Sequence, residues 1–176
     1  MNNKKEPVDI IVVHFNRIKF IKTYLLMLHL FTFYPFRLIV VDNGSTDGSR
    51  EWLLKMKEKG LVWKTVFTKE NKPLAEAIAE GFKEVESEYF ITSANDMIVP
   101  YKKFPYGPNV CWLIMLVASL EHYTDYGSIN FYGLRQGFAP FRAKRWSGLK
   151  KIADSEKLEK LHKTIFADGE DYYLNL

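Results

Sequence analysis

The polar residues best suited to chemistry each come directly after a short apolar run. His14 and Asn16 follow the first run, Asp42 follows the second, and Asn95 and Asp96 follow a later one. In an open α/β sheet, ligands bind beyond the carboxyl ends of the strands, so these side chains can share one site. Oxygen ligands of this kind suit Mg²⁺ or Mn²⁺ bridging phosphates. The spacing therefore favours a carboxylate site for a phosphate-bearing ligand.

Several other kinds of site are excluded by what the chain lacks. It has no Gly-x-Gly-x-x-Gly after the first apolar run, no phosphate-binding Gly-x-x-x-x-Gly-Lys-Ser/Thr and no Gly-x-Ser-x-Gly. The single cysteine, Cys111, permits no internal disulfide and is interpreted as a small buried hydrophobe. The histidines are too scattered for a zinc site or a triad, and we interpret each as structural: His14, His29, His122 and His162.

Strand-like and helix-like segments alternate along the first hundred positions, around these polar residues. Four β-branched or apolar runs are typical of strands, and the segments between them carry apolar residues at helical spacing. This order predicts an α/β fold with a mostly parallel, Rossmann-like sheet flanked by helices on both faces. The predicted strands are 8–13, 36–41, 61–67 and 89–92, and the helices run from Ile18 to Leu28, through Trp52 to Gly60, and from Pro73 to Val85.

The second part of the chain is less regular. Residues 101–108 are predicted to form a loop, 109–121 a buried helix, and 127–140 short strands or loop. A basic amphipathic helix is predicted over 149–165, with four apolar residues on its inner side: Ile152, Leu158, Leu161 and Ile165. No repeat or low-complexity linker interrupts the sequence, so we expect one domain over residues 1–176.

Composition and charge narrow the classes of protein further. The 176 residues are 47% hydrophobic and 26% charged, which excludes a disordered chain, and a net charge of +4 does not indicate a nucleic-acid binder. The longest apolar run, 110–120, is shorter than the ~20 residues of a membrane span, and the N-terminus has no signal-peptide pattern. We therefore expect a cytoplasmic protein. The basic segment 142–163 is compatible with a solvated helix face, an anionic substrate or peripheral contact with the inner membrane face.

Five segments resemble family 2 glycosyltransferases of the GT-A fold. VDIIVVHFNR (8–17) and LIVVDNGSTDGS (38–49) look like the opening of that family, and NKPLAEA (71–77) is similar to its Asn-x-Gly-x-x-x-Ala segment. YFITSANDMIVP (89–100) resembles the strand that leads into the metal-binding Asp-x-Asp, and DGEDYYL (168–174) resembles the Gly-Glu-Asp segment near the end of the catalytic domain. The likeness covers 8–100 continuously and the last dozen positions.

This resemblance implies a nucleotide-diphosphate sugar as donor and assigns residues to it. Asp42 would hydrogen-bond the base or ribose of the donor. Asp96, at the second Asp of Asp-x-Asp, would coordinate Mn²⁺ or Mg²⁺ on the diphosphate. The same donor pocket would include Val13, His14, Asn16, Asn71 and Asn95.

The resemblance also assigns the acceptor side. Asp171 would be the general base that deprotonates the acceptor hydroxyl, with Glu170 beside it, because an alcohol is a poor nucleophile at neutral pH. A single displacement at the anomeric carbon inverts its configuration. Arg142, Arg145 and Trp146 are weaker candidates for contact with a phosphate or the acceptor. Residues 1–100 would then form the nucleotide-sugar half of the domain and 101–176 the acceptor half.

The chain departs from the family pattern at several positions. Ala94 replaces the first Asp of Asp-x-Asp, which predicts weaker metal binding by Asp96. Pro73 stands where the family usually has Gly, and Ala79 where Asn or Arg is frequent. The chain ends five residues after Asp171, so we expect either a minimal or a truncated enzyme.

The sequence leaves three functions open. The first is an inverting glycosyltransferase of the hexosyltransferase type, acting in glycan biosynthesis on a saccharide, lipid-linked or protein hydroxyl. The second is a non-catalytic relative that keeps a nucleotide or glycan pocket, which Ala94 favours. The third, a sugar-phosphate nucleotidyltransferase, should carry a Gly-rich loop with an Arg after the first strand, and residues 14–17 offer none.

Overall fold

The computed structural model describes residues 6–96, 99, 112–122 and 155–166. The chain divides into two compact units, Met1–Leu25 with Pro35–Met97 and Leu26–Tyr34 with Ile98–Leu176. The strands are β1 (Val8–His14), β2 (Phe36–Asp42), β3 (Lys64–Phe67) and β4 (Phe90–Ala94). The helices are α1 (Ile18–Phe31), α2 (Ser49–Glu58), α3 (Leu74–Phe82), α4 (Trp112–His122) and α6 (Ser155–Ile165).

The first unit is built on a four-stranded parallel sheet in the order β3-β2-β1-β4. The register aligns the strand ends: His14 lies opposite Asp42, Asp42 opposite Phe67, and Val13 opposite Ala94. The predicted parallel sheet is confirmed. Because all four strands run in one direction, the residues that follow them meet at a single edge of the sheet.

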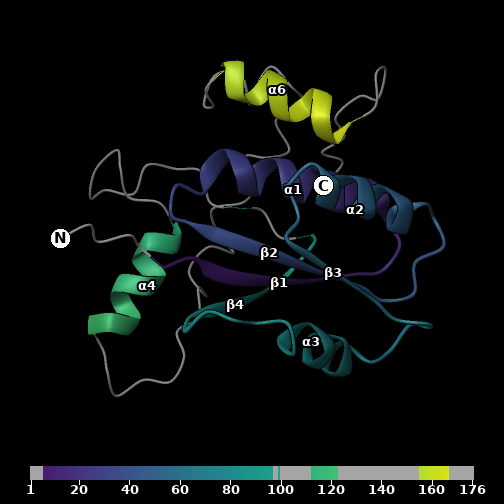
Figure 1. Cartoon of the computed structure of the whole chain (residues 1–176), viewed down its shortest axis with the longest axis horizontal. Helices are drawn as coiled ribbons and strands as arrows, with labels where there is room; N and C mark the ends of the chain where they lie inside the picture. Colours follow the sequence, from purple (N-terminus) through teal and green to yellow (C-terminus); the bar gives the residue numbers. More distant parts are fainter. Residues whose placement is uncertain (1–5, 97–98, 100–111, 123–154, 167–176) are drawn as a thin grey trace. The chain divides into compact units, whose positions relative to one another are not determined.

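Helices cover both faces of this sheet. Figure 1 shows α2 and the first turns of α1 on one face and α3 on the other. On the α3 face, the fully buried side chains of Ile11, Ile39 and Val41 pack with Ala77. A Cβ added to Gly81 of α3 would lie 2.6 Å from a methyl of Ile11, so α3 approaches the sheet closely at this glycine.

Two strand boundaries differ from those predicted. The predicted start of the third strand at residue 61 is wrong, because β3 begins at Lys64. The backbone N–H groups of Leu61 and Val62 donate instead to the carbonyl of Met56, which completes the end of α2. The fourth strand is shifted toward its carboxyl end and includes Ala94.

The second unit contains two of the predicted helices. In α4, Leu113 and Val117 are buried, and the indole N–H of Trp112 donates to Thr32 at 3.0 Å. Leu161 and Ile165 of α6 are buried as predicted, while three of its lysines are exposed: Lys157, Lys160 and Lys163. No helix in the described part of the chain is long and apolar enough to cross a membrane. The remainder of the predicted helix 149–165, Cys111 and the segment 127–140 lie outside the described residues.

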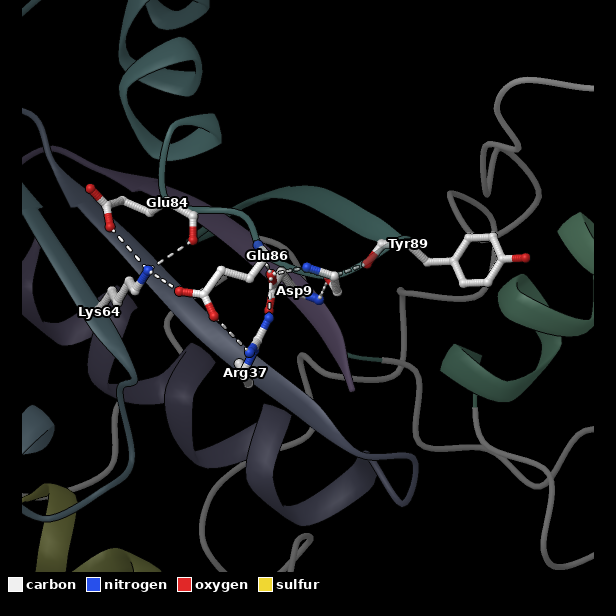
Figure 2. A network of polar contacts seen from close by, with 7 residues as sticks. Asp9, Arg37, Lys64, Glu84, Glu86 and Tyr89 are labelled. Atoms are coloured by element: carbon white, nitrogen blue, oxygen red, sulfur yellow. Dashed lines mark hydrogen bonds and ion pairs between the residues drawn. The ribbon is translucent and has the colours of Figure 1, made fainter. Parts of the chain in front are cut away.

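A polar network joins the amino ends of the strands to the segment before β4 (Figure 2). Asp9 is fully buried and accepts hydrogen bonds from Arg37 Nε and Nη2 at 2.7 and 2.9 Å and from the N–H groups of Glu86 and Ser87 at 2.8 and 3.0 Å. Burial alone would raise the pKa of Asp9, but these donors outweigh it and hold the pKa below its ordinary value. Glu86 also pairs with Lys64 at 2.8 Å. The network fixes how the chain enters β4.

Candidate functional site

The carboxyl edge of the sheet gathers most of the predicted donor-site residues. His14 ends β1, Asp42 ends β2, and Asn95 and Asp96 directly follow β4. The backbone N–H of Asn43 donates to the carbonyl of His14 at 2.7 Å, which ties the ends of β1 and β2 together. Sequence spacing predicted this gathering, because parallel strands present their carboxyl ends at one edge.

Asp42 is fully buried, and its two carboxylate oxygens have different surroundings. Oδ1 accepts the N–H of Ser45 at 2.9 Å and lies 3.6 Å from Nε of Arg50. Oδ2 is buried and has no hydrogen-bond partner in the described part of the chain. A buried carboxylate oxygen without a partner costs free energy, so Oδ2 is an acceptor that an N–H or O–H of a ligand would satisfy.

The residue after Asp42 holds a second loop in place. The side chain of Asn43 is buried, and its Nδ2 donates to Asn71 Oδ1 and to the carbonyl of Lys72, both at 2.8 Å. Its Oδ1 accepts from the N–H of Lys72 at 3.0 Å and from Thr68 Oγ1 at 3.1 Å. Asn71, a predicted donor-site residue, is thereby fixed beside the turn. Sequence reasoning did not single out Asn43, although its place between Asp42 and a glycine was a signal.

The connection between β1 and α1 has an unusual backbone. Asn16 and Arg17 adopt φ values of 52° and 58°, a region that residues other than glycine rarely occupy. The side-chain Oδ1 of Asn16 accepts the N–H of Thr46 at 2.9 Å, and the backbone N–H of Asn16 donates to Ser45 Oγ at 2.8 Å. These bonds to the turn after β2 hold the rare conformation. Backbone strain of this kind gathers at functional sites, so the role of residues 13–16 at the donor stays a prediction that this geometry allows.

Asp47 serves the amino ends of two helices. Its Oδ2 accepts the N–H of Ile18, the first residue of α1, at 2.8 Å, and its Oδ1 accepts the N–H of Ser49, the first residue of α2, at 3.2 Å. Burial alone would raise the pKa of Asp47, but the hydrogen bonds from Ser49 and Ile18 lower it below its ordinary value. The bond to α1 depends on how the two turns meet.

His14 is fully buried, and both of its ring nitrogens have partners. Nε2 lies 2.8 Å from Ser49 Oγ, and Nδ1 lies 2.7 Å from Asn95 Nδ2. Burial lowers the pKa of His14 below its ordinary value of about 6.5, and the nearby charges of Asp42 and Asp47 only partly offset this. The imidazole is therefore neutral at pH 7. Its ring joins the ends of β1 and β4 to the start of α2.

The arrangement agrees with what comparison with known proteins finds. Residues 9–106 match the family model described as Glycosyl transferase family 2. The chain belongs to this family. No curated protein matches it.

Two solved structures resemble this family 2 chain in fold. A crystal structure of TarS from S. aureus has a TM-score of 0.54 and 19% identity over 68% of this chain and 20% of that one. The mannosyltransferase PcManGT from Pyrobaculum calidifontis, solved with GDP-Man and Mn2+, has a TM-score of 0.50 and 22% identity over 56% of this chain and 30% of that one. The fold is therefore of the GT-A type, as predicted, and the chain spans a fifth to a third of the length of these two proteins.

The end of β4 determines whether this family 2 chain can hold a divalent metal. Asp96 is exposed, Asn95 is half-buried, and Ala94 occupies the last position of the strand. Both polar side chains offer oxygen, the ligand atom that Mg²⁺ and Mn²⁺ prefer. The described residues contain no group of three or more His, Cys, Asp or Glu placed to hold a metal ion. The donor set thus fits a cation that takes most of its ligands from phosphates and water.

The predicted acceptor side lies outside the described residues. It comprises Glu170 and Asp171 and the weaker candidates Arg142, Arg145 and Trp146. Their roles stay predictions from the family resemblance.

Proposed function

We propose that this chain transfers a sugar from a nucleoside-diphosphate donor to a hydroxyl acceptor with inversion at the anomeric carbon. The observation that carries the proposal is the buried carboxylate of Asp42, whose Oδ2 lacks a partner among the described residues at the carboxyl edge of the sheet. Nucleobases and ribose present N–H and O–H donors that match such an acceptor. Family membership supports the reaction class, and this edge of the sheet would be the place for the donor.

The nucleotide-sugar donor would be positioned by the two turns that meet at this edge. Asp42 would accept a hydrogen bond from the base or ribose, and the backbone of residues 13–16 would lie beside it. The rare φ values of Asn16 and Arg17 and the hydrogen bonds of Asn16 to the next turn support a preformed pocket, since a rigid site loses less entropy when it binds. Asn71 would border the same pocket through its bond to Asn43.

Asp96, helped by Asn95, would hold a divalent cation against the diphosphate. A bound Mn²⁺ or Mg²⁺ would offset the negative charge that develops on the leaving diphosphate. The presence of Mn2+ and GDP-Man in the PcManGT structure supports this assignment. Because Ala94 offers no carboxylate, we expect weaker metal binding than an Asp-x-Asp pair would give.

Asp171, with Glu170 beside it, would act on the acceptor. Its carboxylate would take the hydroxyl proton as the acceptor oxygen forms its bond to the anomeric carbon and the bond from that carbon to the diphosphate breaks. This step releases a nucleoside diphosphate and inverts the configuration. Residues 1–100 would bind the donor, and residues 101–176 would contribute the base and the acceptor contacts.

A non-catalytic, nucleotide-binding relative is the second candidate, and Ala94 favours it. The two functions differ in turnover and not in donor binding. An Ala94→Asp substitution that creates release of sugar from the donor, where the natural chain shows none, would support the second candidate.

Thermal unfolding with UDP, GDP, dTDP and CDP, each with and without Mn²⁺, tests the proposal. A nucleotide at 100 times its dissociation constant adds about 2.7 kcal/mol of stability, a shift of several degrees for a domain of this size. We expect a shift with one nucleotide and its loss in Asp42→Ala, because that change removes the acceptor. No shift with any of the four, in a protein that melts cooperatively, would refute the proposal.

A further inference from the structure

A series of hydrogen-bonded side chains, Asp47, Ser49, His14 and Asn95, runs from the turn after β2 to the residue beside Asp96. Ser49 Oγ donates to Asp47 Oδ1, Ser49 Oγ also contacts His14 Nε2 at 2.8 Å, and His14 Nδ1 contacts Asn95 Nδ2 at 2.7 Å. Ser49 and His14 are both fully buried, so water does not compete for the contact between them. The series links an exposed acid at one end to the predicted metal segment at the other.

Asp47, at one end, fixes the donor and the acceptor of every hydrogen bond in this series. Asp47 is ionised at neutral pH and can only accept, so the hydroxyl proton of Ser49 points toward it. Ser49 Oγ must then accept from His14, which places the imidazole proton on Nε2. His14 Nδ1 is left as an acceptor and requires an N–H donor from Asn95.

We propose that His14 is a positioning residue that turns the Asn95 amide so that its oxygen, and not its nitrogen, is offered beside Asp96 to a divalent cation. The inference rests on the proposed donor function and goes further in naming the second oxygen ligand. No hydrogen bond within the described residues reaches Asn95 Oδ1, which leaves it open to a ligand.

This arrangement bears directly on the missing carboxylate at position 94. An amide oxygen is a ligand for Mg²⁺ or Mn²⁺, whereas an amide NH₂ repels the cation, so the orientation of Asn95 decides whether it helps or hinders. Residues that orient a metal ligand typically change metal affinity 10–100-fold when they are replaced. Ser49 and His14 would change the metal affinity by a factor of this size without touching the metal.

The proton position on His14 can be measured in the unliganded natural chain. Heteronuclear NMR of the ¹⁵N-labelled imidazoles distinguishes a protonated from an unprotonated ring nitrogen, and His14 is assigned by its absence from the spectrum of His14→Gln. We expect a proton on Nε2 and none on Nδ1 at pH 7. A proton on Nδ1 would turn the Asn95 oxygen toward His14 and overturn the proposal.

Mn²⁺ binding tests the predicted effect of Ser49 on the metal ligand Asn95, and the Asn95→Asp variant serves as the control. Free Mn²⁺ is followed by electron paramagnetic resonance in the presence of each of UDP, GDP, dTDP and CDP. We expect Ser49→Ala to weaken Mn²⁺ binding about 10-fold in the natural chain, because the imidazole proton is then no longer held on Nε2. In Asn95→Asp both ends of the side chain are oxygens, so the same Ser49→Ala change should cost less than about 2-fold there.

Equal losses in the two backgrounds, or no loss in the natural chain, would overturn the inference. Nucleotide-induced thermal shifts without Mn²⁺ show whether Ser49→Ala still folds and binds nucleotide. If no nucleotide shifts the melting temperature, the proposed function fails by itself. The NMR result does not depend on any ligand, so it still decides how Asn95 is oriented.

Discussion

Two glycines of the turn after Asp42 share a backbone conformation but not their surroundings. Gly44 and Gly48 both have φ of 84°. A Cβ on Gly44 would lie 2.7 Å from the backbone carbon of Glu70 and 2.9 Å from the nitrogen of Asn71, whereas a Cβ on Gly48 would meet nothing within 4 Å. Gly48→Ala is therefore a matched control for Gly44→Ala, because only Gly44→Ala forces the 43–48 turn away from the 68–72 loop.

The expected loss of stability follows from the positive φ at each glycine and from the close backbone contact at Gly44. Alanine in the left-handed region costs about 1–2 kcal/mol at either position. Gly44→Ala adds an overlap with backbone atoms that cannot rotate away, and overpacking of this kind costs about 1–3 kcal/mol. We expect Gly48→Ala to lower the free energy of unfolding by about 1 kcal/mol and Gly44→Ala by about 3 kcal/mol, measured by urea unfolding at pH 7.

The same pair of variants reports on the site. Displacing the turn at Gly44 should also disturb the bond from the N–H of Ser45 to Asp42, so the nucleotide-induced thermal shift should shrink in Gly44→Ala more than in Gly48→Ala. If the two variants lose equal stability, Gly44 does not approach the backbone of the 68–72 loop closely in solution.

Three further substitutions give distinct outcomes. Asp42→Asn should change the stability of the free protein by less than about 1 kcal/mol, because Oδ2 has no partner to lose among the described residues, yet abolish the nucleotide-induced thermal shift; a loss above about 3 kcal/mol would contradict this. Asp9→Asn should cost about 3 kcal/mol at pH 7. The folded pKa of Asp9 lies below the unfolded value of about 4, so its contribution is present above that pH and lost as the pH falls; urea unfolding from pH 7 to 3 should therefore show a flatter acid decline in the variant, and an unchanged decline would count against it. Gly81→Ala places a Cβ 2.6 Å from Ile11 and 2.7 Å from Val41, so it should lower the melting temperature despite a gain of about 1 kcal/mol in helix propensity, whereas a rise would show that α3 can move outward.

The order of the elements and the edge of the sheet that carries the site could both be predicted from the amino-acid sequence. Buried β-branched runs such as 8–13 and 36–41 can satisfy their apolar side chains only in a sheet covered on both faces, so local pattern and tertiary structure agree. The polar residues after each strand then had to meet at one edge. The third strand was predicted three residues too early, because apolar composition alone does not show that Leu61 and Val62 complete the end of α2.

What each polar side chain does at that edge depends on contacts that form only in the folded chain. Asp47 and His14 were separate polar residues in the sequence, 33 positions apart, and nothing local indicated that Ser49 would connect them. The direction of a hydrogen bond depends on which partner can only accept, and that is settled by contacts between turns distant in the chain. For the same physical reason, the surroundings of the two Asp42 carboxylate oxygens and the contact between Asn95 and His14 could not be predicted from residue type.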